Sequence, residues 1–274
     1  MRGVEIQIRG IHKTFRTRSG DSEALRDVSL DLRPGEFVAL VGPSGCGKTT
    51  LLNLIAGLDH ADAGEIRVDG KKVRGPGPDR TVIFQEAALF PWLTVRANVE
   101  FGLRIRGVRR RAREELVEGA LRSVQLGRYA EALVHELSGG MRQRIALARA
   151  MVLEPAVLLM DEPFASLDLR TRELLEREVE SAWIKDRPTV VFVSHHLKAA
   201  ALLADRIFAF GARPGRILRE VIVEGPRPRN SDSAVVKRVA AELQSTLRNE
   251  VDRTTWLELA GQSAAASDET AAPF

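Results

Sequence analysis

The sequence contains a single cysteine, Cys46, which excludes an internal disulfide and suits a reducing compartment. No apolar run approaches the roughly 18 residues that a membrane span requires, and the opening residues lack the basic, apolar and small-residue order of a signal sequence. Aromatic residues make up only 5 % of the chain, which argues against a nucleic-acid surface built from interleaved basic and aromatic side chains.

The chain also has little excess of either charge: 41 Lys and Arg against 37 Asp and Glu give a net charge of +4. The segment 104–113 carries six arginines, but Glu114, Glu115 and Glu118 follow directly. This pattern favours a solvated helix face, with contact to phospholipid head groups or a partner as the alternative. With 274 residues and 44 % apolar residues, the chain can build a proper core as one large or two small domains.

One nine-residue segment carries the strongest chemical signal. It reads Gly42, Pro43, Ser44, Gly45, Cys46, Gly47, Lys48, Thr49, Thr50 and directly follows the apolar run 37–41. A strand, a glycine-rich loop and Lys-Thr at the start of a helix form a phosphate-binding loop. The glycines let successive backbone N–H groups point inward, and the following helix adds its positive dipole end.

Such a loop binds a nucleoside triphosphate. We expect Lys48 to neutralise the β- and γ-phosphates and the Thr49 hydroxyl to ligate Mg²⁺. Cys46 has no resolving partner, so we interpret it as a packing residue rather than a redox thiol.

The apolar pattern predicts an α/β protein with a parallel sheet covered on both faces, the P-loop NTPase core, joined by an antiparallel β edge layer. Half-buried strands are expected at 4–8 and 28–32 ahead of the buried strand 36–41. Further expected elements are strands at 64–70, 81–84, 156–160, 189–193, 206–210 and 216–223, a helical lobe over 87–150, and helices at 169–185 and 233–248. The Arg-Pro-rich segment 226–229 is interpreted as a linker, and 251–274 as a flexible tail.

Two acidic residues, Asp161 and Glu162, follow the apolar strand 156–160. The carboxyl ends of parallel strands are where ligands gather. Asp161 is predicted to hold Mg²⁺, and Glu162 to accept a proton from the water that attacks the γ-phosphorus.

Residues 137–144, Leu-Ser-Gly-Gly-Met-Arg-Gln-Arg, resemble the signature motif of the ATP-binding cassette family. Ser166-Leu167-Asp168, after Asp161-Glu162-Pro163, resembles the D-loop of that family. Ser138 is also a good helix cap, and Gly139 and Gly140 leave backbone amides exposed at a helix start. The resemblance covers about residues 4–250, which we expect to form one ATPase domain.

The resemblance implies how the site is completed. ATP would be sandwiched in a head-to-tail dimer, with Ser138, Gly139, Gly140 and Asp168 of one copy closing over the phosphate loop of the other. Gln85 resembles the Q-loop glutamine, a ligand of Mg²⁺ or the attacking water, and His195 resembles the switch histidine. Phe15 stands where the family places an aromatic ring under adenine; packing in the core is the alternative.

Residues 84–95 and 212–217 resemble importer cassettes for nitrate, sulfonates and taurine. The resemblance therefore implies an ATPase at the cytoplasmic face of a membrane, with a separate permease and, indirectly, an extracytoplasmic substrate-binding protein. Leu89, Phe90 and Trp92 either receive the permease or pack in the core. The chain departs from the family after the switch histidine, where it has His196, Lys198 and Ala199 in place of acidic residues.

Three rival interpretations follow from the same motifs. Cassettes of DNA repair or chromosome maintenance insert long coiled coils or zinc modules, whereas only 87 residues separate Thr49 from Leu137 and they contain neither heptads nor cysteine pairs. Translation-factor cassettes carry two copies per chain. A regulatory subunit without turnover is disfavoured because Glu162 is present.

Overall fold

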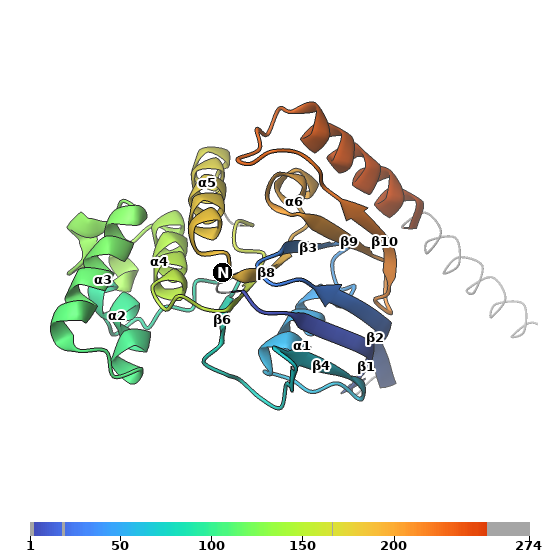
Figure 1. Ribbon diagram of the computed structural model, residues 1–274, viewed down its shortest axis with the longest axis horizontal. Helices are drawn as coiled ribbons and strands as arrows, with labels where there is room; N and C mark the ends of the chain where they lie inside the picture. Colours follow the sequence, from blue (N-terminus) through green and yellow to red (C-terminus); the bar gives the residue numbers. More distant parts are fainter. Residues whose placement is uncertain (1–2, 18–19, 166, 251–274) are drawn as a thin grey trace, which may run out of the picture.

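In the computed structural model, which describes residues 3–17, 20–165 and 167–250, two sheets and a group of helices surround three apolar cores. The predicted tail 251–274 lies outside the described residues. Figure 1 shows the two sheets side by side, with helices α2, α3 and α4 projecting from one end. None of the described helices is both long and apolar enough to span a membrane.

The larger sheet has six strands in the order β10-β9-β3-β8-β7-β6. Its parallel strands are β6 (Arg80–Ile83), β7 (Val157–Asp161), β8 (Thr189–Val193), β3 (Phe37–Val41) and β9 (Arg206–Phe210). The edge strand β10 (Ile217–Ile222) pairs antiparallel with β9. Every residue of β3, β7 and β8 is buried, as expected for short apolar strands in the middle of a sheet covered on both faces.

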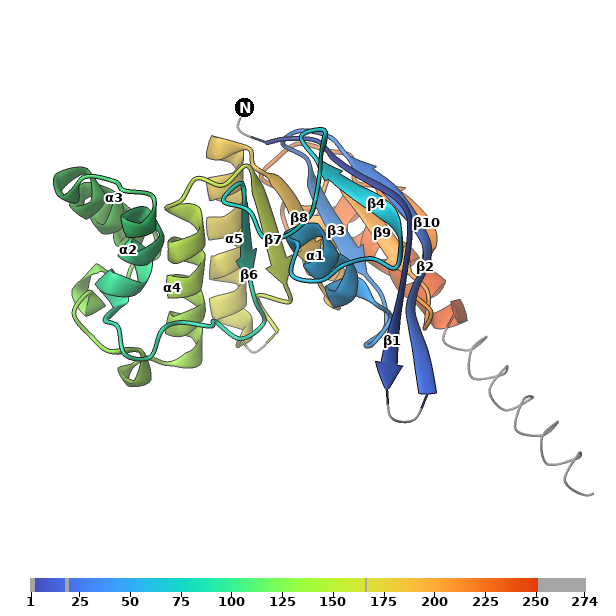
Figure 2. The same ribbon diagram turned by 90° about the horizontal axis from the view of Figure 1, so that it is seen from below.

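The second sheet is antiparallel in the order β2-β1-β4-β5. Its strands are β1 (Ile6–Thr17), β2 (Gly20–Leu32), β4 (Ala63–Val68) and β5 (Lys71–Lys72). The predicted edge layer is therefore present, but β1 and β2 are longer than the alternation indicated. Both strands extend as a hairpin beyond the rest of the sheet (Figure 2). The projecting part has no core to cover, so the alternation of apolar and polar residues stops there.

Helices cover both faces of the larger sheet. Helix α1 (Lys48–Ala56) lies between the two sheets, and Gly57 ends it in a left-handed conformation. The opposite face is covered by α5 (Leu169–Asp186), α6 (Leu197–Leu203) and a helix over 234–250. Helix α6 was not predicted, because its alanine-rich seven residues are largely buried and show no polar face.

The remaining helices form a lobe with its own core. They are α2 (Val95–Ile105), α3 (Arg110–Ser123) and α4 (Gly139–Met151), with 3₁₀ turns at Gly127–Tyr129 and Val134–Glu136. Thr94 and Ser138 cap α2 and α4 by accepting a backbone N–H bond three residues on. Three of the six arginines in segment 104–113 form ion pairs within the lobe, for example Arg110 with Glu114 at 2.8 Å, which fits the solvated-face interpretation.

The Arg-Pro segment predicted as a linker connects β10 to the last helix, but it is fastened to the core. The Arg227 guanidinium lies 2.6 Å from Asp205, 3.2 Å from Glu180, and over the ring of Trp183. Arg229 donates hydrogen bonds to the carbonyls of three core residues. Composition alone could not show this, because the partners lie on α5 and in the turn before β9.

Burial of one carboxyl on α5 makes stability depend on pH. Burial raises the pKa of Glu176 to about 7, partly opposed by Arg172 and Lys198. Since the folded-state pKa lies above the unfolded value, the folded protein holds this proton more tightly. Stability is therefore fully present below about pH 4.5 and is lost as pH rises through 7.

We predict that Glu176→Gln removes this loss. The variant should exceed the wild type at pH 8 by on the order of 2 kcal/mol of unfolding free energy, and the gap should close near pH 5. Urea unfolding at both pH values measures it. The exposed Glu173→Gln is the matched control on the same helix; an equal gain at both pH values for Glu176→Gln would contradict the explanation.

Candidate functional site

The candidate site lies at the carboxyl edge of the larger sheet. Strands β6, β7, β8 and β3 run parallel in a continuous register, with Ile83 opposite Met160, Asp161 opposite Val193, and Leu40 opposite Val193. The segments that follow these strands therefore emerge together. They carry Gln85, the pair Asp161 and Glu162, His195, and the phosphate loop.

The phosphate loop connects β3 to α1 through residues 42–47. Gly47 has a φ of 93° and is the N-cap of α1, where no side chain caps the free amides. A Cβ on Gly47 would lie 2.6 Å from the Ala24 carbonyl oxygen, so β2 presses against the loop at this point. The loop thus requires glycine here both for its backbone conformation and for the close approach of β2.

Lys48 lies inside this loop. Its side chain is buried, and the ammonium donates hydrogen bonds to the carbonyls of Gly42 at 2.9 Å and Pro43 at 2.8 Å. The free amides at the start of α1 and this ammonium form a cationic concavity, which is the arrangement that holds phosphate.

Cys46 packs inside the same loop, as predicted. It is 1 % exposed, and its Sγ accepts a 3.5 Å hydrogen bond from the Lys48 ammonium. Burial raises the pKa of the thiol despite that neighbouring charge, so the thiolate is disfavoured and a redox role is not supported.

Thr49 and Asp161 meet at the start of α1. The Thr49 hydroxyl donates a 3.0 Å hydrogen bond to Asp161 Oδ1. Burial raises the pKa of Asp161, and the charge of Glu162 adds to this, while Thr49 and Lys48 oppose it. Among the described residues no group of three or more His, Cys, Asp and Glu side chains could hold a metal. One hydroxyl and one carboxylate are nevertheless hard oxygen donors that fit Mg²⁺, whose other ligands are commonly phosphate and water.

Glu162 and His195 form the second contact of the site. His195 Nδ1 lies 2.5 Å from Glu162 Oε2, and both side chains remain accessible to solvent. Glu162 has a φ of 46°, unusual for a residue with a side chain, and its N–H bonds to the Val193 carbonyl. Backbone strain of this kind is retained at functional sites. The arrangement directs a carboxylate and an imidazole into the same space.

Gln85 stands two residues beyond β6 and is exposed at the same sheet edge. Phe15 lies on β1 opposite Ser22 and is 40 % exposed, with the Lys13 ammonium 5.1 Å from the ring centroid. This exposure excludes the alternative that Phe15 is a core residue. The hairpin that carries Phe15 also supplies Ala24, which touches the phosphate loop.

The signature residues lie elsewhere. Ser138 caps α4 in the helical lobe, its Oγ accepting the Met141 N–H at 3.3 Å, and Gly139 and Gly140 form the first turn. Within the described residues, no hydrogen bond or ion pair joins these three to the phosphate loop. The structure instead brings the signature next to the D-loop, because a Cβ on Gly140 would lie 3.0 Å from Thr171 and 3.7 Å from Leu167.

Asp168 caps α5 by accepting the Thr171 N–H at 3.0 Å. This backbone hydrogen bond lowers the pKa of the carboxyl. Sequence reasoning did not single out Arg172, one turn further on, whose guanidinium donates to the Leu167 carbonyl at 3.0 Å and therefore braces the D-loop. An arginine in an otherwise charged helix gave no signal for this contact.

An aromatic cluster borders the Gln85 segment. Trp92 is 73 % exposed, and Phe90 contacts both Trp92 and Phe101, with ring centroids 5.6 and 4.6 Å apart. Leu89 packs against the core of the helical lobe. Both interpretations made from the sequence thus describe part of the cluster: Leu89 belongs to a core, while Trp92 is presented to solvent.

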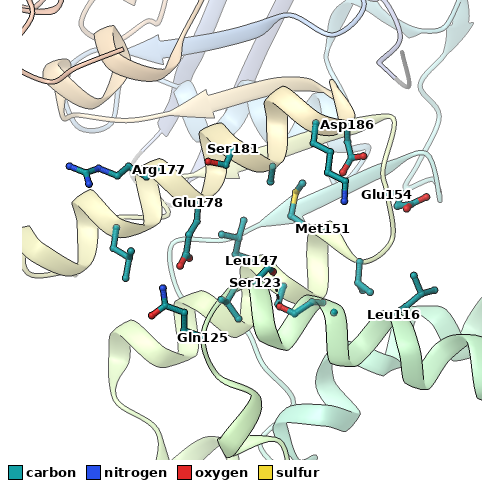
Figure 3. Close-up of a pocket in the computed structure, with 18 of the residues that line it drawn as sticks. Leu116, Ser123, Gln125, Leu147, Met151, Glu154, Arg177, Glu178, Ser181 and Asp186 are labelled. Carbon is teal, nitrogen blue, oxygen red and sulfur yellow. Dashed lines mark hydrogen bonds between the residues drawn. The ribbon is translucent and has the colours of Figure 1, made fainter. Parts of the chain in front are cut away.

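One groove lies away from these residues. It holds about 670 Å³ and lies between α5 and the helices α3 and α4 (Figure 3). Glu178 points from α5 into the groove, and both of its carboxylate oxygens are buried without a hydrogen-bond partner in the part of the chain that the structure describes. Burial raises its pKa, and Arg144 of α4 opposes the shift. The groove lies between α5 of the core and the helices of the lobe.

Fold and site together define a nucleoside triphosphatase with a phosphate-binding loop. The family model described as ABC transporter matches residues 25–165. The chain belongs to the ABC transporter family and is an ATP-binding subunit that hydrolyses ATP. The predicted family, fold class and enzymatic activity are thereby confirmed.

Several relatives are similar over most of the chain. The nitrate import ATP-binding protein NrtD of Synechocystis is 42 % identical over 81 % of this chain and 84 % of its own length. The taurine import ATP-binding protein TauB of Ruegeria pomeroyi is 40 % identical over 92 % of this chain and 94 % of its own. Other relatives at 41–50 % identity have names that state no cargo.

A solved structure shows the same fold. The dimeric post-hydrolysis state of the ATP-binding cassette MJ0796, bound to ADP and Pi, superposes with a TM-score of 0.73 at 31 % identity. The match covers 81 % of this chain and all of that chain.

Proposed function

We propose that this chain energises an importer for a small anion or organosulfonate, of the nitrate, sulfonate or taurine kind, as a head-to-tail dimer on the cytoplasmic face of a membrane. The dimer is inferred from one observation: within one copy, the signature residues lie apart from the phosphate loop. A single chain then supplies only half of each reaction centre. The dimeric state of the similar cassette MJ0796 supports this reading.

Within each shared site, the loop amides and Lys48 bind the phosphates, and Phe15 stacks on adenine. Thr49, Asp161 and Gln85 hold Mg²⁺, which when bound neutralises charge on the phosphates. Glu162 accepts the proton of the attacking water, and His195, held at 2.5 Å from it, contacts the γ-phosphate. Ser138, Gly139, Gly140 and Asp168 of the partner close over the nucleotide. We further propose 4–250 as one ATPase domain with a helical subdomain at about 87–150.

The aromatic cluster is the proposed permease contact. Arg149 of α4 donates to the carbonyls of Ala87 and Ala88 and lies over the Phe90 ring, so the exposed Trp92 stands on a braced loop. Exposed aromatic side chains of this kind mark protein interfaces. The loop follows Gln85, so a partner seated there would act on the ATP site directly. The extracytoplasmic substrate-binding protein would act through that permease.

We predict that Glu162→Gln binds ATP but loses turnover by at least about 10²-fold, because the general base is removed while the phosphate loop is intact. ATP should then accumulate dimers, measured by light scattering beside steady-state phosphate release. Glu173→Gln, on the outer face of α5, is the control. Turnover equal to the wild type would disprove the role assigned to Glu162.

Sharing of the site predicts complementation between two inactive subunits. Ser138→Arg blocks the signature and Lys48→Ala disables phosphate binding, so a mixture should restore one intact site in each heterodimer. For random pairing in an equimolar mixture, half of the dimers are heterodimers with one intact site out of two, so roughly a quarter of wild-type turnover should return. Activity no greater than that of the separate variants would exclude a shared site.

The cargo is tested with the native permease. ATP turnover of the reconstituted complex should rise when the substrate-binding protein is loaded with nitrate, taurine or an alkanesulfonate. The same protein without solute and the Trp92→Ala cassette are the controls. Stimulation by an unrelated solute, such as a sugar or a cationic amino acid, would overturn the proposed cargo class.

A further inference from the structure

His196, where the family usually has aspartate, is packed against the site rather than exposed beside it. Its ring centroid lies 4.0 Å from that of His195, the planes inclined by 41°. The residue is half-buried, its N–H bonds to Ser194 Oγ at 3.0 Å, and its carbonyl accepts the Ala200 N–H at the start of α6. Backbone bonds on both sides therefore hold the His196 ring in place behind His195.

The Arg172 guanidinium, on α5, is one of the charged groups around His196. His196 Nε2 and Arg172 Nε are both buried, and neither has a hydrogen-bond partner among the described residues. Burial lowers the pKa of His196, and the charges of His195 and Arg172 lower it further, while Glu162 opposes this. The shift favours the neutral ring, whose Nε2 accepts a hydrogen bond when Nδ1 carries the proton. A buried donor on α5 and a buried acceptor before α6 are thus both without a partner among the described residues.

Arg172 connects this region to the D-loop, since its guanidinium already bonds to the Leu167 carbonyl at 3.0 Å. Printed contacts join Arg172 to Leu167 on one side, and His196 through His195 to Glu162 on the other; a charge interaction relates Arg172 to His196. A movement of the D-loop that brings Arg172 Nε onto His196 Nε2 would satisfy two buried polar atoms at once. Leaving buried polar atoms unpaired is unfavourable, which gives the movement a driving force.

We propose that His196 is a positioning residue that supports the His195 imidazole against Glu162 and links it to the D-loop through Arg172. The proposal rests on the roles proposed above for Glu162 and His195. In this role, His196 contacts neither the nucleotide nor the attacking water. It keeps His195 from rotating away, and misplacing a catalytic group by about 1 Å can cost about 10²-fold in rate.

Four variants test this role by steady-state ATP turnover of the full chain. His196→Ala removes ring and acceptor, and kcat should fall about tenfold with KM for ATP changed less than about twofold. His196→Phe restores the ring, so kcat should recover to within about threefold of wild type. Arg172→Met should lower kcat, and the double variant His196→Ala with Arg172→Met should be no slower than the slower single variant, within about twofold, because both break one link.

Lys198→Ala, an exposed neighbour on α6, is the matched control and should keep wild-type turnover. Thermal unfolding of each variant separates loss of fold from loss of positioning, and His196→Phe retains the packing volume. A kcat for His196→Ala within twofold of wild type, or rate losses that multiply in the double variant, would overturn the proposal.

Glu162→Gln in the same assay distinguishes failure of the positioning role of His196 from failure of the proposed reaction centre. If Glu162→Gln abolishes turnover while His196→Ala does not, only the positioning role is wrong. If Glu162→Gln turns over like the wild type, the proposed reaction centre is wrong and the role of His196 falls with it.

Discussion

The register of the parallel ladder from β6 through β7 and β8 to β3 is the constraint on which the site depends. Each chemical group follows the last residues of a buried strand, so its position is inherited from the backbone pairing of that strand. A slip of one residue would exchange the faces of every side chain and separate Thr49 from Asp161. Complete burial of β3, β7 and β8 on both faces makes such a slip costly, because the helices on either side pack against specific side chains.

Two kinds of contact then build the reaction centre on that frame. The Thr49 to Asp161 bond joins the helix after the phosphate loop to the middle of the sheet, and the Glu162 to His195 contact joins the next two strand ends. The strained backbone at Glu162 shows that the carboxylate is held where the fold requires it rather than where the chain would relax. The buried strands thus position the Glu162 carboxylate and the His195 imidazole, while the phosphate loop supplies the positive charge of Lys48.

The helical lobe is organised differently, because it carries the signature on a core of its own. A groove of about 670 Å³ separates it from α5, and the buried Glu178 carboxylate in that groove has no hydrogen-bond partner among the described residues. Gly140 nevertheless approaches the D-loop closely. The signature and the D-loop are therefore close together, as the proposed sharing of the site between two copies requires.

The sequence by itself determined the family, the phosphate loop, the acidic pair after an apolar strand and the order of most elements, because these depend on local spacing and on short buried runs. It indicated the strands of both sheets except the two-residue β5, but not the seven-residue α6, whose buried alanines carry no periodic polar face. Only the tertiary structure decided that Phe15 is exposed, that the 226–229 segment is fastened by Arg227, and that His196 stacks on His195. These features depend on residues distant in the chain, and no local pattern encodes which distant side chain will fill the space beside them.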